Sequence, residues 1–200
     1  MHKIDLATCI NALENGKIIV YPTDTLYALG ADIYSDAAVK KIYTLKKRPL
    51  NNPLPVAVPN FSEMTKIAIT GEAAKRLAER FLPGSLTLVL HKKNVGSLNR
   101  VTSGLDKVAV RIPDNPIALE LLRQFGPLTV TSANIHGKKT PHVINKIQMQ
   151  FSKEDIAVYL DYGKLEGKPS TIVDLTVEKP QILRKGVITE KKIAEAIKNG

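Results

Sequence analysis

The sequence predicts an α/β fold, with a twisted, mixed β-sheet and flanking helices. Short runs of aliphatic and β-branched residues, typical of buried strands, recur along all 200 residues. Stretches with apolar residues at helical spacing lie among them. Strands and helices do not alternate strictly, however, so crossover helices cannot join every pair of strands. We therefore expect a mixed sheet rather than a doubly wound parallel one.

The expected strands are apolar runs bounded by turn residues. The first ends at Pro22, and the run at 108–112 ends before Pro113. A glycine-rich turn at 163–170 leads into the run that starts at Thr171. In chain order the expected strands are 17–21, 55–58, 86–90, 108–112, 128–131, 156–160, 171–175 and 181–183.

The expected helices have start or stop signals. Gly16 suits the position after the first helix, and Ser35 or Asp36 can cap the second. The second helix must end by Arg48, because the residue before a proline avoids the α region. Asn115-Pro116 is an N-cap followed by proline at the first helical position. In chain order the expected helices are 4–15, 36–48, 71–81, 116–125 and 191–198.

Composition limits the class of protein. No repeat or long linker divides the chain, so we expect residues 1–200 to form a single domain. There is one cysteine, Cys9, which excludes an intramolecular disulfide and a cysteine zinc site and which we expect to be buried. The N-terminus has no apolar signal region and no stretch reaches transmembrane length, so we expect a cytoplasmic protein that does not bind membranes.

The charge balance points to an anionic partner. The chain has 29 basic and 19 acidic residues, a net charge of +10, and a pI near 9.6. A nucleotide or nucleic acid fits this balance, and so does a soluble surface that is simply rich in lysine. Without tryptophan and with few aromatic residues, a stacking platform for single strands is not expected.

Cations and an amide gather where the second helix ends. Lys46 and Arg48 are two residues apart, so they cannot share a helix face, and Asn52 adds an amide shortly after them. If the chain turns at Pro49, the two cations can clamp one anion from different directions, the arginine bidentately. The alternative is a solvated basic helix terminus that complements the helix dipole.

Three expected strand ends carry polar residues. Thr25 belongs to the Pro-Thr-Asp-Thr segment after the first strand, Arg111 lies near the end of another, and Ser132 and Asn134 follow the 128–131 strand. If these strands share a sheet, their ends converge on one crevice, the usual ligand position in α/β folds. The alternatives are a turn closed by side-chain bonds, a helix cap and a surface charge.

Other chemistry has little support in the sequence. The histidines show no metal-binding spacing, and there is no nucleophile elbow. The segment Gly163 to Ser170 is superficially similar to a phosphate-binding P-loop. Its glycines are one residue too close, and Pro169 replaces the hydroxyl residue that should hold Mg²⁺, so we reject it as such.

Taken together, the motifs resemble the YrdC-type L-threonylcarbamoyladenylate synthase family in its single-domain form. They are, in order, residues 21–30, the K-x-R of Lys46 and Arg48, residues 83–89 and 110–113, the S-x-N of Ser132 and Asn134, and residues 170–174. The resemblance covers nearly the whole chain. It implies a YrdC-like fold and synthesis of threonylcarbamoyl-AMP and pyrophosphate from L-threonine, bicarbonate and ATP. The product would feed a separate tRNA-modifying transferase.

The resemblance also implies roles for individual residues. Lys46, Arg48, Ser132 and Asn134 are the expected catalytic residues of the two signature motifs. The expected threonine-binding residues are Thr25, Arg111 and Ser170. The expected ATP-binding residues are Arg48, Asn52, Ser132, Thr140 and Arg184. No protein metal site is expected, and Mg²⁺ would accompany ATP, held by phosphates and water.

The chain departs from the family at three positions. Ala28 stands where glycine is usual, Ser85 replaces a frequent proline, and Lys107 occupies a position often held by a small hydroxyl residue near ATP. Both K-x-R and S-x-N are kept, which places the chain on the synthase side of the family. Longer relatives carry a second C-terminal domain. We do not expect one here, because the chain ends soon after Arg184.

A module that binds double-stranded RNA or ribosomes, without synthase activity, is the competing hypothesis. The family's fold has a basic concave surface, and a net charge of +10 is compatible with such a role. RNA binding can also coexist with catalysis, because the product is destined for tRNA.

Overall fold

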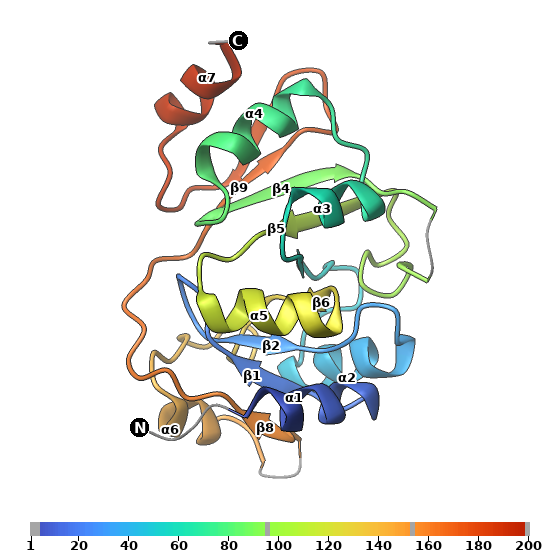
Figure 1. Ribbon diagram of the computed structural model, residues 1–200, viewed down its shortest axis with the longest axis vertical. Helices are drawn as coiled ribbons and strands as arrows, with labels where there is room; N and C mark the ends of the chain where they lie inside the picture. Colours follow the sequence, from blue (N-terminus) through green and yellow to red (C-terminus); the bar gives the residue numbers. More distant parts are fainter. Residues whose placement is uncertain (1–4, 95–96, 153–154, 199–200) are drawn as a thin grey trace.

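The computed structural model describes residues 5–94, 97–152 and 155–198 (Figure 1). Its helices are α1 (Leu6–Glu14), α2 (Asp36–Lys46), α3 (Phe61–Ile67), α4 (Glu72–Phe81), α5 (Pro116–Phe125), α6 (Ile144–Gln148) and α7 (Glu190–Lys198). Its strands are β1 (Ile19–Tyr21), β2 (Ala28–Gly30), β3 (Val56–Ala57), β4 (Leu86–His91), β5 (Lys107–Arg111), β6 (Leu128–Thr129), β7 (Thr131–Ser132), β8 (Val158–Tyr159), β9 (Thr171–Asp174) and β10 (Gln181–Arg184).

The strands form two sheets with mixed pairing, which confirms the predicted α/β class. The larger sheet has the order β10-β9-β4-β5-β3-β6, and the smaller has the order β7-β2-β1-β8. Each contains parallel pairs, such as β4 with β9 and β1 with β8, beside antiparallel ones. The single sheet expected from the sequence is thus divided in two.

The run 128–131, expected to be one strand, joins the two sheets. Leu128 and Thr129 pair with β3 of the larger sheet, and Thr131 and Ser132 pair with β2 of the smaller. Between them the backbone N–H of Val130 bonds to the carbonyl of Pro55. This switch of partners places Ser132 at the junction of the two sheets.

The helices cover the outer faces of these sheets (Figure 1). Helices α4 and α7 contact each other over the end of the molecule formed by β9 and β4, and α1 and α5 contact each other beside β1. A large core cluster extends through both sheets, and a second one joins α1, β1 and α5. Cys9 belongs to the second cluster and is fully buried, as expected, and burial raises the pKa of its thiol to about 11.

The end of α2 explains why Lys46 and Arg48 point in different directions. Lys46 is the last helical residue, and Lys47 adopts the left-handed conformation with φ of 51°. The N–H groups of Lys47 and Arg48 then bond to the carbonyls of Thr44 and Tyr43, the pattern that closes many helices. The chain therefore reverses between the two cations.

Three elements were not predicted: β2, α3 and α6. Strand β2 follows shortly after the Pro-Thr-Asp-Thr segment and has only three residues. Helix α3 does have a start signal, because the Asn60 side chain accepts a hydrogen bond from the N–H of Glu63. The predicted start of the first helix, Ile4, lies outside the described residues. No helix in the described part of the chain is long and apolar enough to cross a bilayer.

Candidate active site

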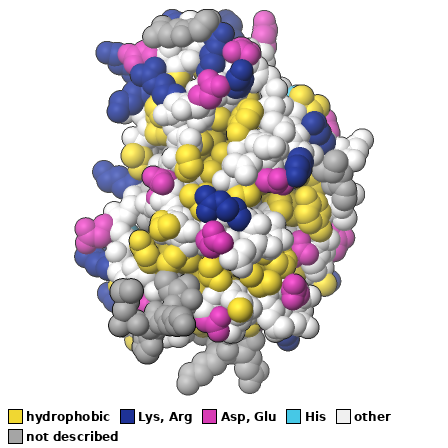
Figure 2. Space-filling model, in the orientation of Figure 1, with side chains coloured by type: hydrophobic (Ala, Val, Ile, Leu, Met, Phe, Trp, Pro, Cys, Tyr) yellow, Lys and Arg dark blue, Asp and Glu magenta, His cyan; other side chains and the backbone are white. Residues whose placement is uncertain are grey.

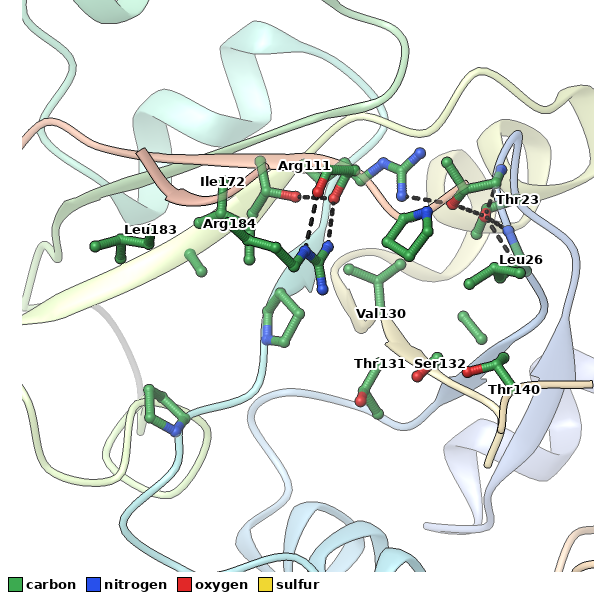
Figure 3. A pocket seen from close by; sticks show the side chains of 18 of the residues that line it. Thr23, Leu26, Arg111, Val130, Thr131, Ser132, Thr140, Ile172, Leu183 and Arg184 are labelled. Atoms are coloured by element: carbon green, nitrogen blue, oxygen red, sulfur yellow. Dashed lines mark hydrogen bonds between the residues drawn. The ribbon is translucent and has the colours of Figure 1, made fainter. Parts of the chain in front are cut away.

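A cavity of about 410 Å³ lies where the two sheets meet (Figure 3). Its walls come from the turn between β1 and β2, the loop after α2, strands β4 and β5, strand β7, and the segment that leads into β9 and β10. Eight residues singled out from the sequence line it: Thr25, Arg48, Asn52, Arg111, Ser132, Thr140, Ser170 and Arg184. The strand ends therefore converge on one crevice as predicted, although they come from two sheets and not from the one shared sheet that was expected.

Arg111 is held rigidly at one end of this cavity. It is 5% exposed, and its Nη2 lies 2.7 Å from both carboxylate oxygens of Asp24. Its Nε donates to the carbonyl of Gly84 at 3.0 Å and its Nη1 to the hydroxyl of Thr25 at 2.9 Å. Burial lowers the pKa of Arg111 and the Asp24 carboxylate opposes that shift, so the cation is partly balanced before any ligand binds.

Asp24 positions Arg111, and the sequence did not identify it in that role. Besides Arg111, it accepts hydrogen bonds from the hydroxyl of Ser85 at 2.8 Å and the N–H of Asp114 at 3.0 Å. These bonds fix the carboxylate from two segments of the chain, one at Ser85 and one at residues 111–114. Its place in the Pro-Thr-Asp-Thr motif, opposite an arginine at a strand end, is the signal that could have found it.

The Pro-Thr-Asp-Thr segment is indeed a turn closed by side-chain bonds. The hydroxyl of Thr23 accepts from the N–H groups of Thr25 and Leu26, each at 3.1 Å, and bonds to the carbonyl of Leu26 at 2.6 Å. Thr25 lines the cavity, and its hydroxyl lies 3.0 Å from the hydroxyl of Thr23 and 2.9 Å from Nη1 of Arg111. The motif is thus both a turn closed by side-chain hydrogen bonds and a part of the cavity wall.

Ser170 and Arg184 also line the cavity and are bonded to each other. Arg184 donates from Nε to the carbonyl of Ser170 and from Nη2 to its hydroxyl, both at 3.0 Å. The same hydroxyl lies 2.8 Å from that of Thr87, a buried residue of β4 that the sequence reasoning did not single out. Burial lowers the pKa of Arg184, and so does the positive charge of Arg111, so this side of the cavity favours an anion.

Arg48 and Asn52 also line the cavity and are bonded to each other. Arg48 donates from Nε to the carbonyl of Asn52 at 2.9 Å and from Nη2 to the side-chain oxygen of Asn52 at 2.7 Å. Its Nη2 also donates to the carbonyl of Pro53 at 2.9 Å. No described residue accepts a hydrogen bond from its Nη1. The guanidinium is therefore preorganised with one nitrogen available to a ligand.

Lys46 does not take part in the expected two-cation clamp. It is 2% exposed, and its Nζ donates to the carbonyls of Ser132 at 2.5 Å and Asn134 at 2.8 Å. It does not line the cavity, because the helix end directs it into the 132–134 loop while Arg48 turns the other way. Burial lowers the pKa of Lys46 from 10.5 to about 7, helped by the charge of Arg48. Its visible role is to hold this loop.

Asn134 also acts inside the loop. Its side-chain oxygen accepts from the hydroxyl of Ser132 at 2.6 Å, and its side-chain nitrogen donates to the carbonyls of Ile135 and Lys138. Of the S-x-N pair, only Ser132 lines the cavity. Each signature motif therefore has one residue that lines the cavity, Arg48 or Ser132, and one buried residue that holds the 132–134 loop, Lys46 or Asn134.

Residues 161–170 form a strap that runs from the smaller sheet to the larger one and carries Ser170 to the cavity. Tyr27 holds its start, because the phenol accepts from the N–H of Tyr162 at 2.8 Å and donates to the carbonyl of Gly163 at 2.7 Å. Farther along, Gly167 packs so closely on Thr25 that a Cβ there would lie 2.3 Å from the Thr25 carbonyl oxygen. The segment rejected as a P-loop is thus a wall of the cavity.

Neither aspartate nor glutamate is among the residues that line the cavity, and the described residues contain no group of three His, Cys, Asp or Glu able to hold a metal. Hydroxyls, amides and guanidinium groups bind anionic ligands instead. Lys107, one of the departures, pairs with Asp174 at 3.1 Å and does not line the cavity. Ala28 does line it and is buried in β2.

The chain was then compared with known proteins. The model of the Sua5/YciO/YrdC family, described as "Telomere recombination", matches residues 11–186. A protein of Methanocaldococcus jannaschii is 40% identical over 90% of this chain and 84% of its own length. The threonylcarbamoyl-AMP synthase of Bacillus subtilis is 39% identical over 96% of this chain. This chain spans only 56% of that relative.

Solved structures agree with these matches. Pyrococcus abyssi Sua5 in complex with L-threonine superposes with a TM-score of 0.91 and 37% identity, covering 96% of this chain and 57% of its own. Escherichia coli YciO superposes with a TM-score of 0.86 and 28% identity, covering 94% of this chain and 92% of its own. The overall fold is therefore shared with both.

Proposed function

Because the chain belongs to the Sua5/YciO/YrdC family, we propose that it is a threonylcarbamoyl-AMP synthase, which uses L-threonine, bicarbonate and ATP. The cavity between the sheets carries this proposal. A cation suited to an amino-acid carboxylate, Arg111, and cations suited to phosphates, Arg48 and Arg184, line this same cavity. Relatives that share 31% to 39% identity bear this name, and one homologous structure holds L-threonine.

The threonine site would lie around Arg111. The guanidinium, already fixed by Asp24, meets the threonine carboxylate, and the hydroxyls of Thr25 and Ser170 bond to its polar groups. ATP would occupy the rest of the cavity, on Arg48, Asn52, Ser132, Thr140 and Arg184. Lys46 and Asn134 serve the reaction by fixing the loop that carries Ser132.

The chemistry requires positioning more than a protein nucleophile. The threonine amine attacks the carbon of bicarbonate, water leaves, and a carbamate forms. A carbamate oxygen then attacks the α-phosphorus of ATP, the bond to the β-phosphate bridging oxygen breaks, and pyrophosphate departs. The arginines stabilise the negative charge that accumulates on the phosphates. Mg²⁺ would be bound by the phosphates and water, since the described cavity wall offers it no carboxylate.

The competing hypothesis, an RNA-binding module without synthase activity, is not favoured by the relatives that match, which are named as synthases. On the face shown in Figure 2, basic side chains over α4 and α7 have acidic ones between them. Transfer of the product to a tRNA-modifying transferase, and direct contact with RNA, are proposals that follow from the chemistry of the product rather than from this surface.

Pyrophosphate release from ATP tests the function directly. Release by the purified protein should require both L-threonine and bicarbonate, and should be lower with serine or valine. Arg48→Ala should lower the rate by about 100-fold or more, because a preorganised cation is lost from the proposed phosphate site. The matched control is Arg123→Ala, an exposed arginine on α5. Release that ignores threonine, or equal loss in both variants, would contradict the proposal.

A further inference from the structure

A second hollow, of about 830 Å³, adjoins the two signature motifs without belonging to the active site. We call it the α2 groove; its walls are one face of α2 with Lys47 after it, and residues 17–18, 135, 150–152, 155 and 157. Leu45 and Lys47 line it on either side of Lys46, and Ile135 lines it directly after Asn134. The lining of the groove therefore includes residues within or next to both motifs.

The rim of the groove is strongly basic. Four exposed lysines line it: Lys17, Lys40, Lys41 and Lys47. None of them forms a salt bridge with a described residue, although Lys41 donates to the carbonyl of Gly16 at 3.1 Å. The one described carboxylate in the lining, Asp155, accepts from the N–H and hydroxyl of Ser152. The rim thus has an excess of uncompensated positive charge.

The floor of the groove is apolar. Ile18 is 3% exposed and Phe151 is 8% exposed, while Leu45 and Ile135 are partly buried against the main core. The side chains of α2 at positions 37, 40, 41 and 44 share one helix face. Because the side chain of Ala37 is small, it leaves the apolar floor accessible beside Lys40 and Lys41. An apolar strip flanked by ammonium groups is the result.

We propose that the α2 groove docks an acidic, amphipathic segment of a partner protein. Apolar side chains of that segment would pack on the floor, and its carboxylates would meet the four lysines. A nucleic acid fits less well. The described lining contains no arginine to fork onto phosphates and only one aromatic ring, nearly buried, and phosphates set against Ile18 and Leu45 would lose hydration without compensation.

Selection from a library of random dodecapeptides on phage tests this proposal. Peptides enriched on the wild-type protein should combine Asp or Glu with Leu, Ile or Phe. Their affinity, measured by fluorescence anisotropy, should fall about tenfold or more in the double variant Lys17→Glu, Lys40→Glu, because opposite charges become like charges. Ala37→Trp, which fills the floor without changing charge, should weaken them similarly.

The matched control is Lys191→Glu with Lys192→Glu, which makes the same charge change on two exposed lysines of α7. It should change the affinity less than twofold. Absence of enrichment, enriched peptides without acidic residues, or equal weakening in both double variants would overturn the proposal. A short RNA duplex that binds tighter than the peptides and loses affinity in the groove variants would overturn it in favour of RNA. Pyrophosphate release by these variants reports separately on the synthase reaction.

Discussion

At the scale of single residues, the site depends on buried charges that are held by neighbours which never touch a ligand. Asp24 fixes Arg111 through two contacts of 2.7 Å. Asp24→Asn removes that charge and leaves a buried guanidinium poorly compensated. We expect the KM for L-threonine to rise by about tenfold or more while the KM for ATP changes little. Steady-state kinetics with each substrate varied would measure this.

Ser85→Ala is the control for that change, because Ser85 contributes only one neutral donor to the same carboxylate. The loss of one such hydrogen bond costs about 1 kcal/mol, so its effect on threonine should be smaller. A threonine KM that is unaltered in Asp24→Asn would show that Arg111 needs no help to be positioned.

Lys46 makes a second prediction at this scale. Its pKa is about 7 in the folded protein and 10.5 without burial, so between these values the unfolded chain binds more protons than the folded one. The contribution of this group to the free energy of unfolding therefore rises with pH above about 7, by at most about 1.4 kcal/mol per pH unit. Below pH 7 both states are protonated and the contribution is flat.

Denaturant unfolding of the wild type and of Lys46→Met at several pH values would measure that difference. The gap between the two proteins should change with pH only above neutrality. A constant gap from pH 6 to 9, a range taken to bracket the folded pKa, would mean that Lys46 keeps an ordinary pKa. Lys46→Met should also slow pyrophosphate release, because the loop with Ser132 loses its tie.

At the scale of elements, the strap of residues 161–170 has little room for an added side chain where it packs on Thr25. A Cβ at Gly167 would meet the carbonyl oxygen and Cα of Thr25 at 2.3 and 2.4 Å, and backbone cannot yield as a flexible side chain can. Gly167→Ala should therefore displace the strap and raise the KM for L-threonine by about tenfold. Gly71→Ala, where the added Cβ meets nothing within 4 Å, is the matched control. Normal kinetics in Gly167→Ala would refute this role.

Elements also show where sequence reasoning reached its limit. Long apolar runs and capped helices were placed within a few residues, because their signals are local. Strand β2 was missed because three residues shortly after a turn carry no period. The run 128–131 was seen, but its division between two sheets is a choice of partners that no local pattern encodes.

The site could be predicted further than the topology. The types and order of polar residues indicated an anion-binding crevice, and eight of the named residues line one cavity. The clamp expected from the sequence was wrong for Lys46, whose side chain does not reach the cavity. Its direction depends on the left-handed conformation of Lys47, which reverses the chain. Thr87 and Asp24 act through contacts with residues far along the chain, which spacing alone cannot reveal.

At the scale of the whole molecule, the cavity belongs to both sheets, so its ligands should stabilise both. Ser132 lies on the smaller sheet, whereas Arg111 and Arg184 lie on the larger. At 100 times its dissociation constant a ligand adds about 2.7 kcal/mol to the stability of the folded state. With L-threonine and a non-hydrolysable ATP analogue, amide hydrogen exchange should slow in β1–β2 and in β9–β10 together. Protection confined to one sheet would contradict a shared site.

The parallel pairing of β8 with β1 and of β9 with β4 has a consequence for how the protein is made. A ribosome releases Thr25, Arg48, Arg111 and Ser132 well before it releases the strap and Ser170. A nascent chain that stops near residue 150 therefore holds most of the recognition groups but has neither β8 nor β9 beside its central strands. The wall of the cavity that holds Ser170 is synthesised last, so we expect the complete cavity to form only when synthesis of the fold is almost finished.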